Sequence, residues 1–167
     1  SHFQTFITIN CLQYKTNTMK SFLIIIAAIL MVQLSYSQEK GDSMKYKELT
    51  EKEKQVIINK GTERAFTGKY YKHDAKGVYT CKRCGAHLYR SEDKFDANCG
   101  WPSYDDEIEG AVKRVPDADG RRTEIICNNC DAHLGHVFTG EGYTEKNVRH
   151  CVNSISLEFI PAEKLIE

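Results

Sequence analysis

The sequence contains little proline and no surplus of either charge. Only 3 of its 167 residues are proline, and 23 lysines and arginines balance 23 acidic residues. The low proline count excludes a collagen-like or proline-rich disordered chain. A protein that mainly binds nucleic acid usually has a basic surplus. The balanced charge therefore argues against a nucleic-acid partner and favours small or neutral ligands.

A hydrophobic run long enough to span a bilayer is also absent. The apolar run Phe22 to Val32 has 11 residues, whereas a spanning helix needs about 20. Met19-Lys20 precedes this run and the small residues Ser35 and Ser37 follow it, a pattern typical of a secretory signal peptide. We expect residues 1–37 to be an upstream extension plus a signal peptide, cleaved near Ser37/Gln38, with no stable membrane insertion afterwards.

Cleavage would leave a linker at 38–48 and one domain at 49–167, which suits a chain of this length. We expect secretion across the inner membrane to the periplasm, and a monomer. Cys11 lies upstream of the cleavage site and has no functional role in this interpretation. The other six cysteines would meet an oxidising compartment in which disulfides persist, so metal ligands and disulfides must be distinguished.

The mature sequence predicts one short helix followed mainly by strands. Thr50 and Glu53 have the capping-box pattern, Val56 to Ile58 are apolar and Gly61 is a plausible stop, so we expect a helix of about ten residues. The predicted strands are 77–80, 86–90, 111–115, 124–126 and 154–160. The last alternates, with its apolar residues on one face. Short connections favour antiparallel pairing, and the expected class is mainly β, with two antiparallel sheets in a small sandwich or open barrel.

Four cysteines stand in two Cys-x-x-Cys pairs. Cys81 and Cys84 form the first, and Cys127 and Cys130 form the second, with 42 residues between the two pairs. Together they can supply the tetrahedral four-thiolate site that structural zinc prefers. Two disulfides or two redox motifs are the alternatives, but a redox motif needs a helix after its first cysteine, and neither pair has a helical pattern. We expect one structural Zn²⁺ that staples a small domain.

Cys99 and Cys151 remain after the metal ligands are assigned. Cys151 follows Arg149 and His150, whose charges can stabilise a thiolate, and it stands at the start of the predicted strand 154–160. Cys99 precedes Gly100, which permits backbone movement. From these residues alone, a reactive pair, a structural disulfide and two inert thiols all stay open.

Several motifs in order resemble those of the B-type methionine sulfoxide reductases. They are Gly61-Thr62-Glu63, Phe66-Thr67-Gly68, the first cysteine pair with Gly85, Lys94-Phe95, Cys99-Gly100-Trp101-Pro102-Ser103, Arg122-Thr123-Glu124, His133-Leu134-Gly135-His136-Val137-Phe138 and Arg149-His150-Cys151-Val152-Asn153-Ser154. The resemblance runs from about Leu49 to Pro161. It implies two antiparallel sheets with zinc on the far side, and reduction of the R epimer of methionine sulfoxide, protein-bound or free. It also implies regeneration by a thioredoxin-type reductant.

The resemblance assigns the two remaining cysteines. Cys151 is the expected nucleophile, which becomes a sulfenic acid as methionine is released. Cys99 is the expected resolving thiol, which forms a disulfide with it if the two Cα atoms come within about 7 Å. The rival functions are a zinc module that only binds a protein or nucleic acid, and a general thiol-disulfide oxidoreductase or zinc-dependent chaperone.

The other candidate residues meet the remaining needs of sulfoxide reduction. Trp101 offers an aromatic surface for the methyl-sulfur unit of the substrate. His133 and His136 are the candidates for polarising or protonating the sulfoxide oxygen, although a His-x-x-His pair can also bind metal or face solvent. Asn153 is expected to position the site, and Arg149 to help Cys151 ionise.

Two positions depart from the family pattern. The acid that often stands two residues after Val-Phe is replaced by Gly140, and Glu141 follows it. Any role of that acid can therefore fall to Glu141. The Ser-Gly often found before the resolving cysteine is here Ala97-Asn98.

Overall fold

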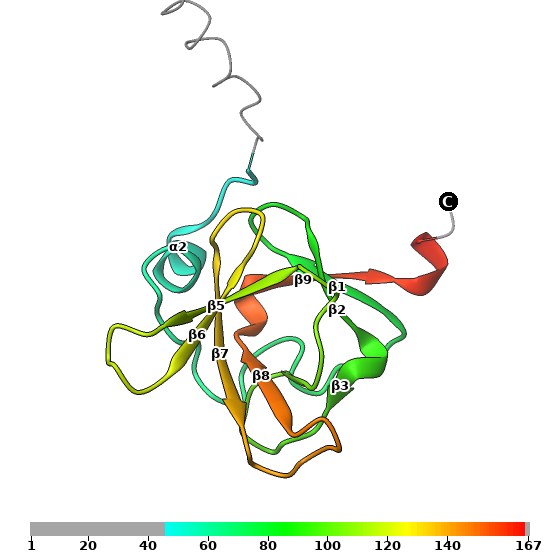
Figure 1. Ribbon diagram of the computed structural model, residues 1–167. Helices are drawn as coiled ribbons and strands as arrows, with labels where there is room; N and C mark the ends of the chain where they lie inside the picture. The colour runs from blue at the N-terminus through cyan, green and yellow to red at the C-terminus, as the bar shows by residue number, and fades with distance from the viewer. Residues whose placement is uncertain (1–45, 166–167) are drawn as a thin grey trace, which may run out of the picture. The chain divides into compact units, whose positions relative to one another are not determined.

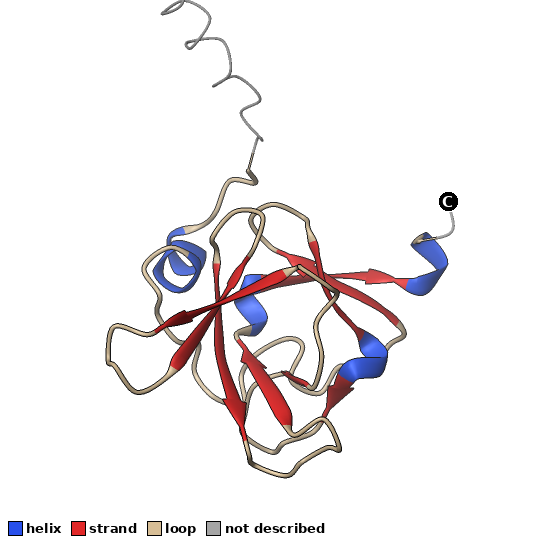
Figure 2. Cartoon of the chain, viewed as in Figure 1, coloured by secondary structure: helices blue, strands red, loops and turns tan. Residues whose placement is uncertain are grey.

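The computed structural model describes residues 46–165, which are mainly β (Figures 1 and 2). The predicted signal peptide, its cleavage site, Cys11 and all but the last residues of the linker lie outside the described residues. Between residues 46 and 165, no helix has both the length and the apolar character needed to cross a membrane.

The helix α2 (Glu51–Ile57) begins at the predicted capping box. The Thr50 hydroxyl accepts a hydrogen bond from the Glu53 backbone N–H, and the Glu53 carboxylate accepts one from the Thr50 backbone N–H. The helix has 7 residues and is shorter than predicted, because the chain turns away through Lys60, whose φ is 58°. Gly61 packs against the helix end, where a Cβ would stand 2.6 Å from a carbonyl oxygen.

Two antiparallel sheets hold the strands, as predicted. One has the order β2-β1-β9 and the other β3-β4-β8-β7-β6-β5. The strands are β1 (Gly77–Cys81), β2 (His87–Arg90), β3 (Lys94–Phe95), β4 (Ser103–Tyr104), β5 (Val112–Pro116), β6 (Thr123–Cys127), β7 (His133–Thr139), β8 (Val148–Val152) and β9 (Leu157–Pro161). The 3₁₀ helices between residues 46 and 165 are η1 (Ser91–Asp93), η2 (Ser154–Ser156) and η3 (Ala162–Lys164). The predicted fold class is confirmed.

Four predicted strands correspond to β1, β2, β5 and β6, and no end differs by more than one residue. The fifth prediction, 154–160, is wrong in its first half, because η2 occupies 154–156 and only β9 pairs with β1. The alternating pattern fails there because its serines are buried. Ser154 Oγ accepts a hydrogen bond from the Tyr70 backbone N–H at 3.1 Å, and Ser156 Oγ donates one to the His133 carbonyl at 2.9 Å.

The strands β7 and β8 are not among the predicted strands, yet they carry four of the expected catalytic residues, His133, His136, Arg149 and Cys151. In their pairing, Gly135 lies opposite Val152 and His136 lies opposite Cys151. A Cβ at Gly135 would stand 2.0 Å from the Cys151 carbonyl oxygen, so the close approach of the two strands requires glycine. On its other side β8 pairs with β4, where Ser103 faces Cys151. Cys151 therefore lies in the interior strand β8, which corrects its predicted place at the start of strand 154–160.

Tyrosines fill much of the core between the two sheets. Tyr79 on β1, Tyr89 on β2 and Tyr104 on β4 are fully buried. The rings of Tyr89 and Tyr104 stack with centroids 4.3 Å apart, and Tyr79 meets Tyr104 edge-on at 5.2 Å. Such pairs contribute about 0.5–1.5 kcal/mol each beyond their buried area. Because the rings come from both sheets, they help to fix one sheet against the other.

Candidate active site and metal centre

The four predicted zinc ligands lie together, with all their sulfur atoms within 4.8 Å of one another. Cys81 Sγ is 3.6 Å from Cys130 Sγ, and Cys84 Sγ is 3.6 Å from Cys127 Sγ. Tetrahedral coordination with metal–sulfur bonds of about 2.3 Å separates the sulfurs by about 3.8 Å, whereas a disulfide bond is about 2.05 Å long. The spacing fits a four-thiolate zinc site and not two disulfides.

The two cysteine pairs form equivalent turns. The Gly85 backbone N–H donates to the Cys81 carbonyl at 2.8 Å, and the Asp131 N–H donates to the Cys127 carbonyl at 2.9 Å. Gly85 and Asp131 both have left-handed φ values, 77° and 57°. Since β1 ends at Cys81 and β6 ends at Cys127, a zinc ion held here would tie one sheet to the other.

Cys99 and Cys151 also come together, with their Sγ atoms 3.9 Å apart. Cys151 lies on β8, whereas Cys99 lies in the loop between β3 and β4. The Cys99 sulfur is also 3.5 Å from the Ser103 hydroxyl and accepts a hydrogen bond from Arg149 Nη1 at 3.5 Å. The geometry therefore suits a pair that alternates between dithiol and disulfide.

The two thiols interact so closely that their ionisation is coupled. A hydrogen bond from Cys151 is the main cause that lowers the pKa of Cys99 to about 5, and burial opposes it. The same hydrogen bond, and then burial, raises the pKa of Cys151, while the charge of Arg149 lowers it. The first negative charge of the reduced pair therefore resides on Cys99. Arg149 acts in the expected direction, because its charge and hydrogen bond both lower the pKa of Cys151.

Arg149 is held in place by Glu141. Its Nε and Nη2 atoms donate to the two carboxylate oxygens of Glu141 at 2.7 and 2.9 Å. Its guanidinium also lies 4.5 Å from the ring centroid of Phe138. The hydrogen bond from Arg149 lowers the pKa of Glu141, which is therefore charged at neutral pH. An acid at position 141 thus reaches the arginine although position 140 is glycine.

The prediction that His150 stabilises the Cys151 thiolate is wrong. Neighbouring side chains on a strand point to opposite faces, and His150 is fully buried against Tyr89 and Arg114. Its Nδ1 lies 3.1 Å from Tyr89 Oη, and its Nε2 lies 3.1 Å from Arg114 Nη2. Burial, followed by the charge of Arg114, lowers the pKa of His150 to about 4, so the ring is neutral at pH 7.

A cavity of about 110 Å³ opens beside Cys151. Its lining residues are Thr62, Trp101, Arg122, Gly135, His136, Phe138, Cys151 and Asn153. Three of the predicted residues, Trp101, His136 and Asn153, therefore meet the predicted nucleophile in one small pocket. The Trp101 indole N–H donates to the Glu63 carbonyl at 2.9 Å, which fixes the orientation of the ring.

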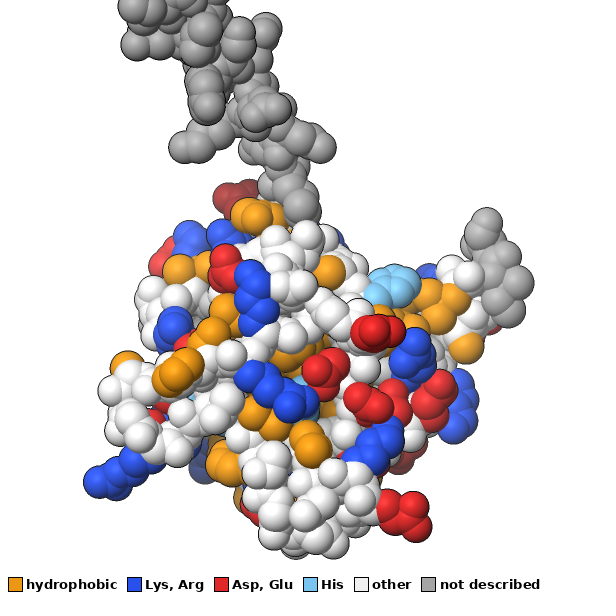
Figure 3. All heavy atoms as spheres, viewed as in Figure 1, with side chains coloured by type: hydrophobic (Ala, Val, Ile, Leu, Met, Phe, Trp, Pro, Cys, Tyr) orange, Lys and Arg blue, Asp and Glu red, His pale blue; other side chains and the backbone are white. Residues whose placement is uncertain are grey.

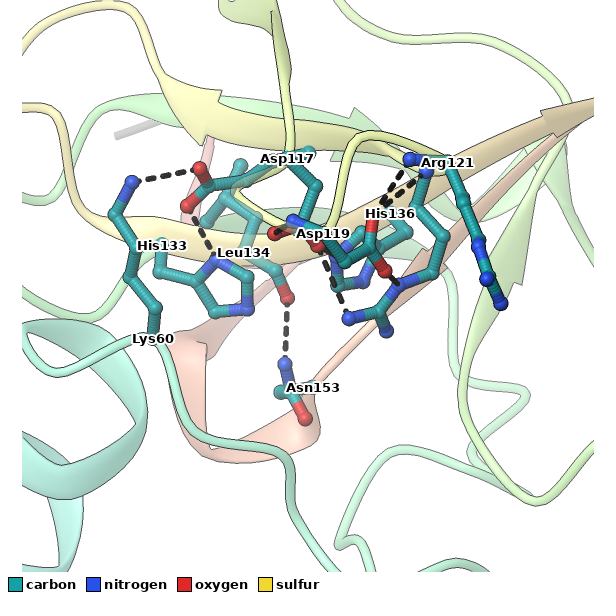
Figure 4. Close-up of polar contacts among 10 residues, drawn as sticks. Lys60, Asp117, Asp119, Arg121, His133, Leu134, His136 and Asn153 are labelled. Carbon is teal, nitrogen blue, oxygen red and sulfur yellow. Dashed lines mark hydrogen bonds and ion pairs between the residues drawn. The ribbon is translucent and has the colours of Figure 1, made fainter.

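Each histidine of the His-x-x-His motif is paired with a carboxylate (Figure 4). His133 Nδ1 lies 2.7 Å from Glu124 Oε1, and His136 Nε2 lies 2.5 Å from Asp117 Oδ2. Lys60 Nζ donates to the other Glu124 oxygen at 2.7 Å. His136 lines the cavity, whereas His133 is buried, does not line it, and has no hydrogen-bond partner at Nε2 within residues 46–165.

Within residues 46–165, the four cysteines are the one group of three or more possible ligands with the spacing of a metal site. The rings of His133 and His136 instead meet edge-on with centroids 5.6 Å apart. Asn153 has the expected positioning contacts. Its Nδ2 donates to the Leu134 carbonyl at 3.0 Å (Figure 4), and its Oδ1 accepts from the Glu63 N–H at 2.8 Å.

Sequence reasoning did not assign roles to Glu124 and Asp117. Glu124 had a detectable signal, because a carboxylate followed by Ile125-Ile126 in a predicted strand needs a buried partner. Its side chain is only 3% exposed. Asp117 lies just after β5, in the turn toward β6, and nothing in the sequence indicates that this turn reaches His136.

Comparisons with known proteins agree with this site. The family model described as the SelR domain matches residues 49–161. Peptide methionine sulfoxide reductase B3 of Arabidopsis thaliana is 46% identical over 138 residues, which cover 82% of this chain and 78% of that protein. Peptide methionine sulfoxide reductase B8 of the same plant is 47% identical over 133 residues, which cover 79% of this chain and 93% of that protein.

Two further comparisons cover a smaller share of one of the two compared chains. Peptide methionine sulfoxide reductase B3, chloroplastic, of Oryza sativa subsp. japonica is 54% identical over 110 residues, which cover 65% of this chain and 48% of that protein. Among solved structures, the Mis18 "Yippee-like" domain has a TM-score of 0.40 and 18% identity, and covers 51% of this chain and 95% of that chain.

Proposed function

The chain belongs to the SelR domain family and is a peptide methionine sulfoxide reductase of the B type, and we propose that Cys151 reduces the R epimer of methionine sulfoxide in oxidised proteins. One observation carries this proposal. The Cys151 sulfur lines a small pocket with Trp101 and His136, and a second thiol lies 3.9 Å away. The pocket has a volume of about 110 Å³, well below the roughly 300–1,000 Å³ of sites for drug-sized ligands. This volume suits the end of a single substrate side chain.

In the first step, the Cys151 thiol gives its proton to Cys99 and attacks the sulfoxide sulfur. Two electrons pass from the cysteine sulfur to the substrate sulfur, and the protonated oxygen is transferred to Cys151. The products are methionine and a Cys151 sulfenic acid. The hydrogen bond from Cys151 lowers the pKa of Cys99 to about 5, so Cys99 is a thiolate at neutral pH, and its sulfur lies 3.9 Å from the Cys151 sulfur, within reach of the proton.

His136 is the proposed proton donor to the sulfoxide oxygen. It lines the pocket, and Asp117 orients the ring through its contact with His136 Nε2. The hydrogen bond from His136 lowers the pKa of Asp117, so the carboxylate is charged at neutral pH. Proton donation of this kind contributes about 10²–10⁴ in rate. Through the neighbouring ring of His133, Glu124 helps to fix the position of His136.

In the second step, Cys99 attacks the sulfenic sulfur of Cys151. A disulfide forms between them, and the hydroxyl group leaves as water with one proton. A thioredoxin-type dithiol then reduces this disulfide, in the compartment that the predicted signal peptide would select.

The zinc ion has a structural role in this proposal. Cys81, Cys84, Cys127 and Cys130 would hold it, and it would contribute folding energy by joining β1 to β6. The catalytic thiols do not belong to this cluster, so the ion need not contact the substrate.

The decisive experiment measures turnover of separated R and S epimers of a methionine-sulfoxide peptide. The wild type should reduce only the R epimer, and Cys151→Ser should be inactive with every reductant. Cys99→Ser should lose activity with thioredoxin at every pH but keep it with dithiothreitol at alkaline pH, where Cys151 ionises without Cys99 and dithiothreitol reduces the sulfenic acid directly. Activity of Cys151→Ser would contradict the assignment and favour a binding role.

A further inference from the structure

A second hollow adjoins the Cys99 loop and shares no lining residue with the sulfoxide pocket. Its volume is about 420 Å³, and its lining residues are Phe66, Gly68, Lys69, Tyr71, Lys72 and Asn98. Asn98 directly precedes Cys99. The mechanism proposed above uses none of these residues.

Phe66 exposes its ring from a strained backbone. The residue is 61% exposed and has a φ of 65°, in the left-handed region that bulky residues seldom adopt. The Phe66 backbone N–H donates to the Gly100 carbonyl at 2.8 Å, which ties this residue to the Cys99 loop. A Cβ at Gly100 would stand 2.8 Å from the Ala65 Cβ. Such strain at an exposed apolar residue points to a surface selected for binding.

The aromatic surface continues from Phe66 to the residue beside Cys99. The Tyr71 ring meets the Phe66 ring edge-on with centroids 5.4 Å apart, and Tyr71 Oη donates to Asn98 Oδ1 at 3.4 Å. Lys72 Nζ lies 5.7 Å from the centroid of the Tyr71 ring. The charged residues that line the hollow are Lys69 and Lys72, with no acid among them. The hollow therefore fits a partner protein that presents an apolar side chain within an acidic surface.

We propose that this hollow docks the protein dithiol that reduces the Cys99–Cys151 disulfide. The proposal rests on the function proposed above. A thiolate of the reductant attacks Cys99 Sγ, a mixed disulfide forms, and Cys151 leaves as a thiolate. The second thiol of the reductant then attacks the mixed disulfide at the reductant's own sulfur and releases Cys99. Two electrons and two protons pass to the cysteine pair, and the reductant leaves as a disulfide.

The position of the two sulfurs favours attack at Cys99. Cys151 lies between paired strands and opens into a pocket of about 110 Å³, which is too small for a protein loop. Cys99 lies on a loop, next to a residue that lines the larger hollow. In the mixed disulfide, Cys151 also loses the hydrogen bond to the Cys99 thiolate that raises its pKa, whereas the favourable charge of Arg149 remains. Its departure as a thiolate is then easier.

The test compares reductants with the full chain. Phe66→Asn removes the ring but suits a left-handed backbone, and Lys72→Glu reverses one charge. Each variant should raise the KM for thioredoxin about 5- to 30-fold, as expected for removal of an interface hot spot, and leave turnover with dithiothreitol unchanged. The effect of Lys72→Glu should shrink as salt rises. Leu165→Ala, at a residue with 42% exposure far along the chain, is the matched control and should change neither value.

An unchanged KM for thioredoxin in both variants would overturn the docking proposal. It would also fail if the variants lost activity only toward folded oxidised proteins with either reductant, because the hollow would then hold the substrate. A wild type that fails to reduce the R epimer with dithiothreitol would refute the proposed function itself, which separates the two failures.

Discussion

Glu141 accepts two hydrogen bonds from Arg149, through both carboxylate oxygens, and the third guanidinium nitrogen faces the Cys99 sulfur. Glu141→Gln keeps the shape but removes the charge of this bidentate pair. Hydrogen bonds to charged groups contribute about 1.5–3 kcal/mol. Only part of this loss should appear as a higher activation free energy. We expect a roughly tenfold lower kcat/KM for the R-sulfoxide peptide with dithiothreitol.

Glu145→Gln is the matched control, because Glu145 is an exposed acid of the same loop. It should behave as the wild type. If Glu141→Gln were equally active, Arg149 would not need its partner and the acid at 141 would have no functional role.

Replacement of Cys99 should shift the pH profile. In the wild type, a thiolate is available above about pH 5, because the hydrogen bond from Cys151 lowers the pKa of Cys99 to about 5. In Cys99→Ser, Cys151 has no thiolate neighbour and must lose its proton to solvent. With dithiothreitol, the acid limb of kcat/KM should therefore move to higher pH by at least one unit, toward the ordinary cysteine value of about 8.5.

Alkylation provides an independent measurement of the same coupling. Iodoacetamide should label Cys99 of the wild type at mildly acidic pH, and Cys151→Ala should delay this labelling to higher pH. Coincident pH profiles for the wild type and both variants would show that the two thiols ionise independently.

The sequence predicts the chemistry of this protein better than the local structure that positions it. The cysteine pairs, the capping box and four strands follow from spacing and composition, which are local properties. The strand β8 is different, because its pattern Val-Arg-His-Cys-Val contains a charged residue and a buried histidine. Burial of Arg149 and His150 depends on Glu141, Tyr89 and Arg114, which come from other parts of the chain.

The ionisation of the thiols also depends on the tertiary structure. Arg149 and His150 both precede Cys151, and the sequence favours a role for each at the thiolate. Strand geometry separates them, since His150 faces Tyr89 and only Arg149 reaches the thiols. The shared proton follows from the 3.9 Å approach of Cys99, a distance that no sequence pattern gives.

Removal of zinc should destabilise the domain and leave the catalytic thiols chemically intact. Cys84→Ser breaks the four-thiolate site, and we expect loss of the single bound zinc and a large fall in Tm, because the ion joins β1 to β6. Elemental analysis and thermal unfolding measure both effects. Cys99→Ser should retain one zinc per chain. A wild type with no bound metal and an unchanged Tm in Cys84→Ser would contradict a structural zinc site.

The buried Glu124 should make stability depend on pH. Burial raises its pKa, but hydrogen bonds from Lys60 and His133 outweigh burial, so the pKa falls below the ordinary value of 4.5. A carboxyl group with a lowered pKa stabilises the fold above pH 4.5, and this contribution is lost as the pH falls through the folded pKa. Glu124→Gln should therefore be less stable than the wild type at pH 7, by about 1–3 kcal/mol for a buried group that loses its charged partner.

This difference should begin to shrink below pH 4.5 and close only once the pH falls below the lowered folded pKa, where the wild-type carboxylate takes up a proton and becomes as neutral as the amide. Denaturant unfolding at pH 7 and at a series of pH values below 4.5 measures it. The exposed Glu109 supplies the control, because Glu109→Gln experiences the same acid effects on the cysteine cluster without altering the buried pair. Equal stability of Glu124→Gln and Glu109→Gln at pH 7 would mean that the Lys60–Glu124–His133 contacts add nothing to folding, and His133 would then have to be held by packing alone.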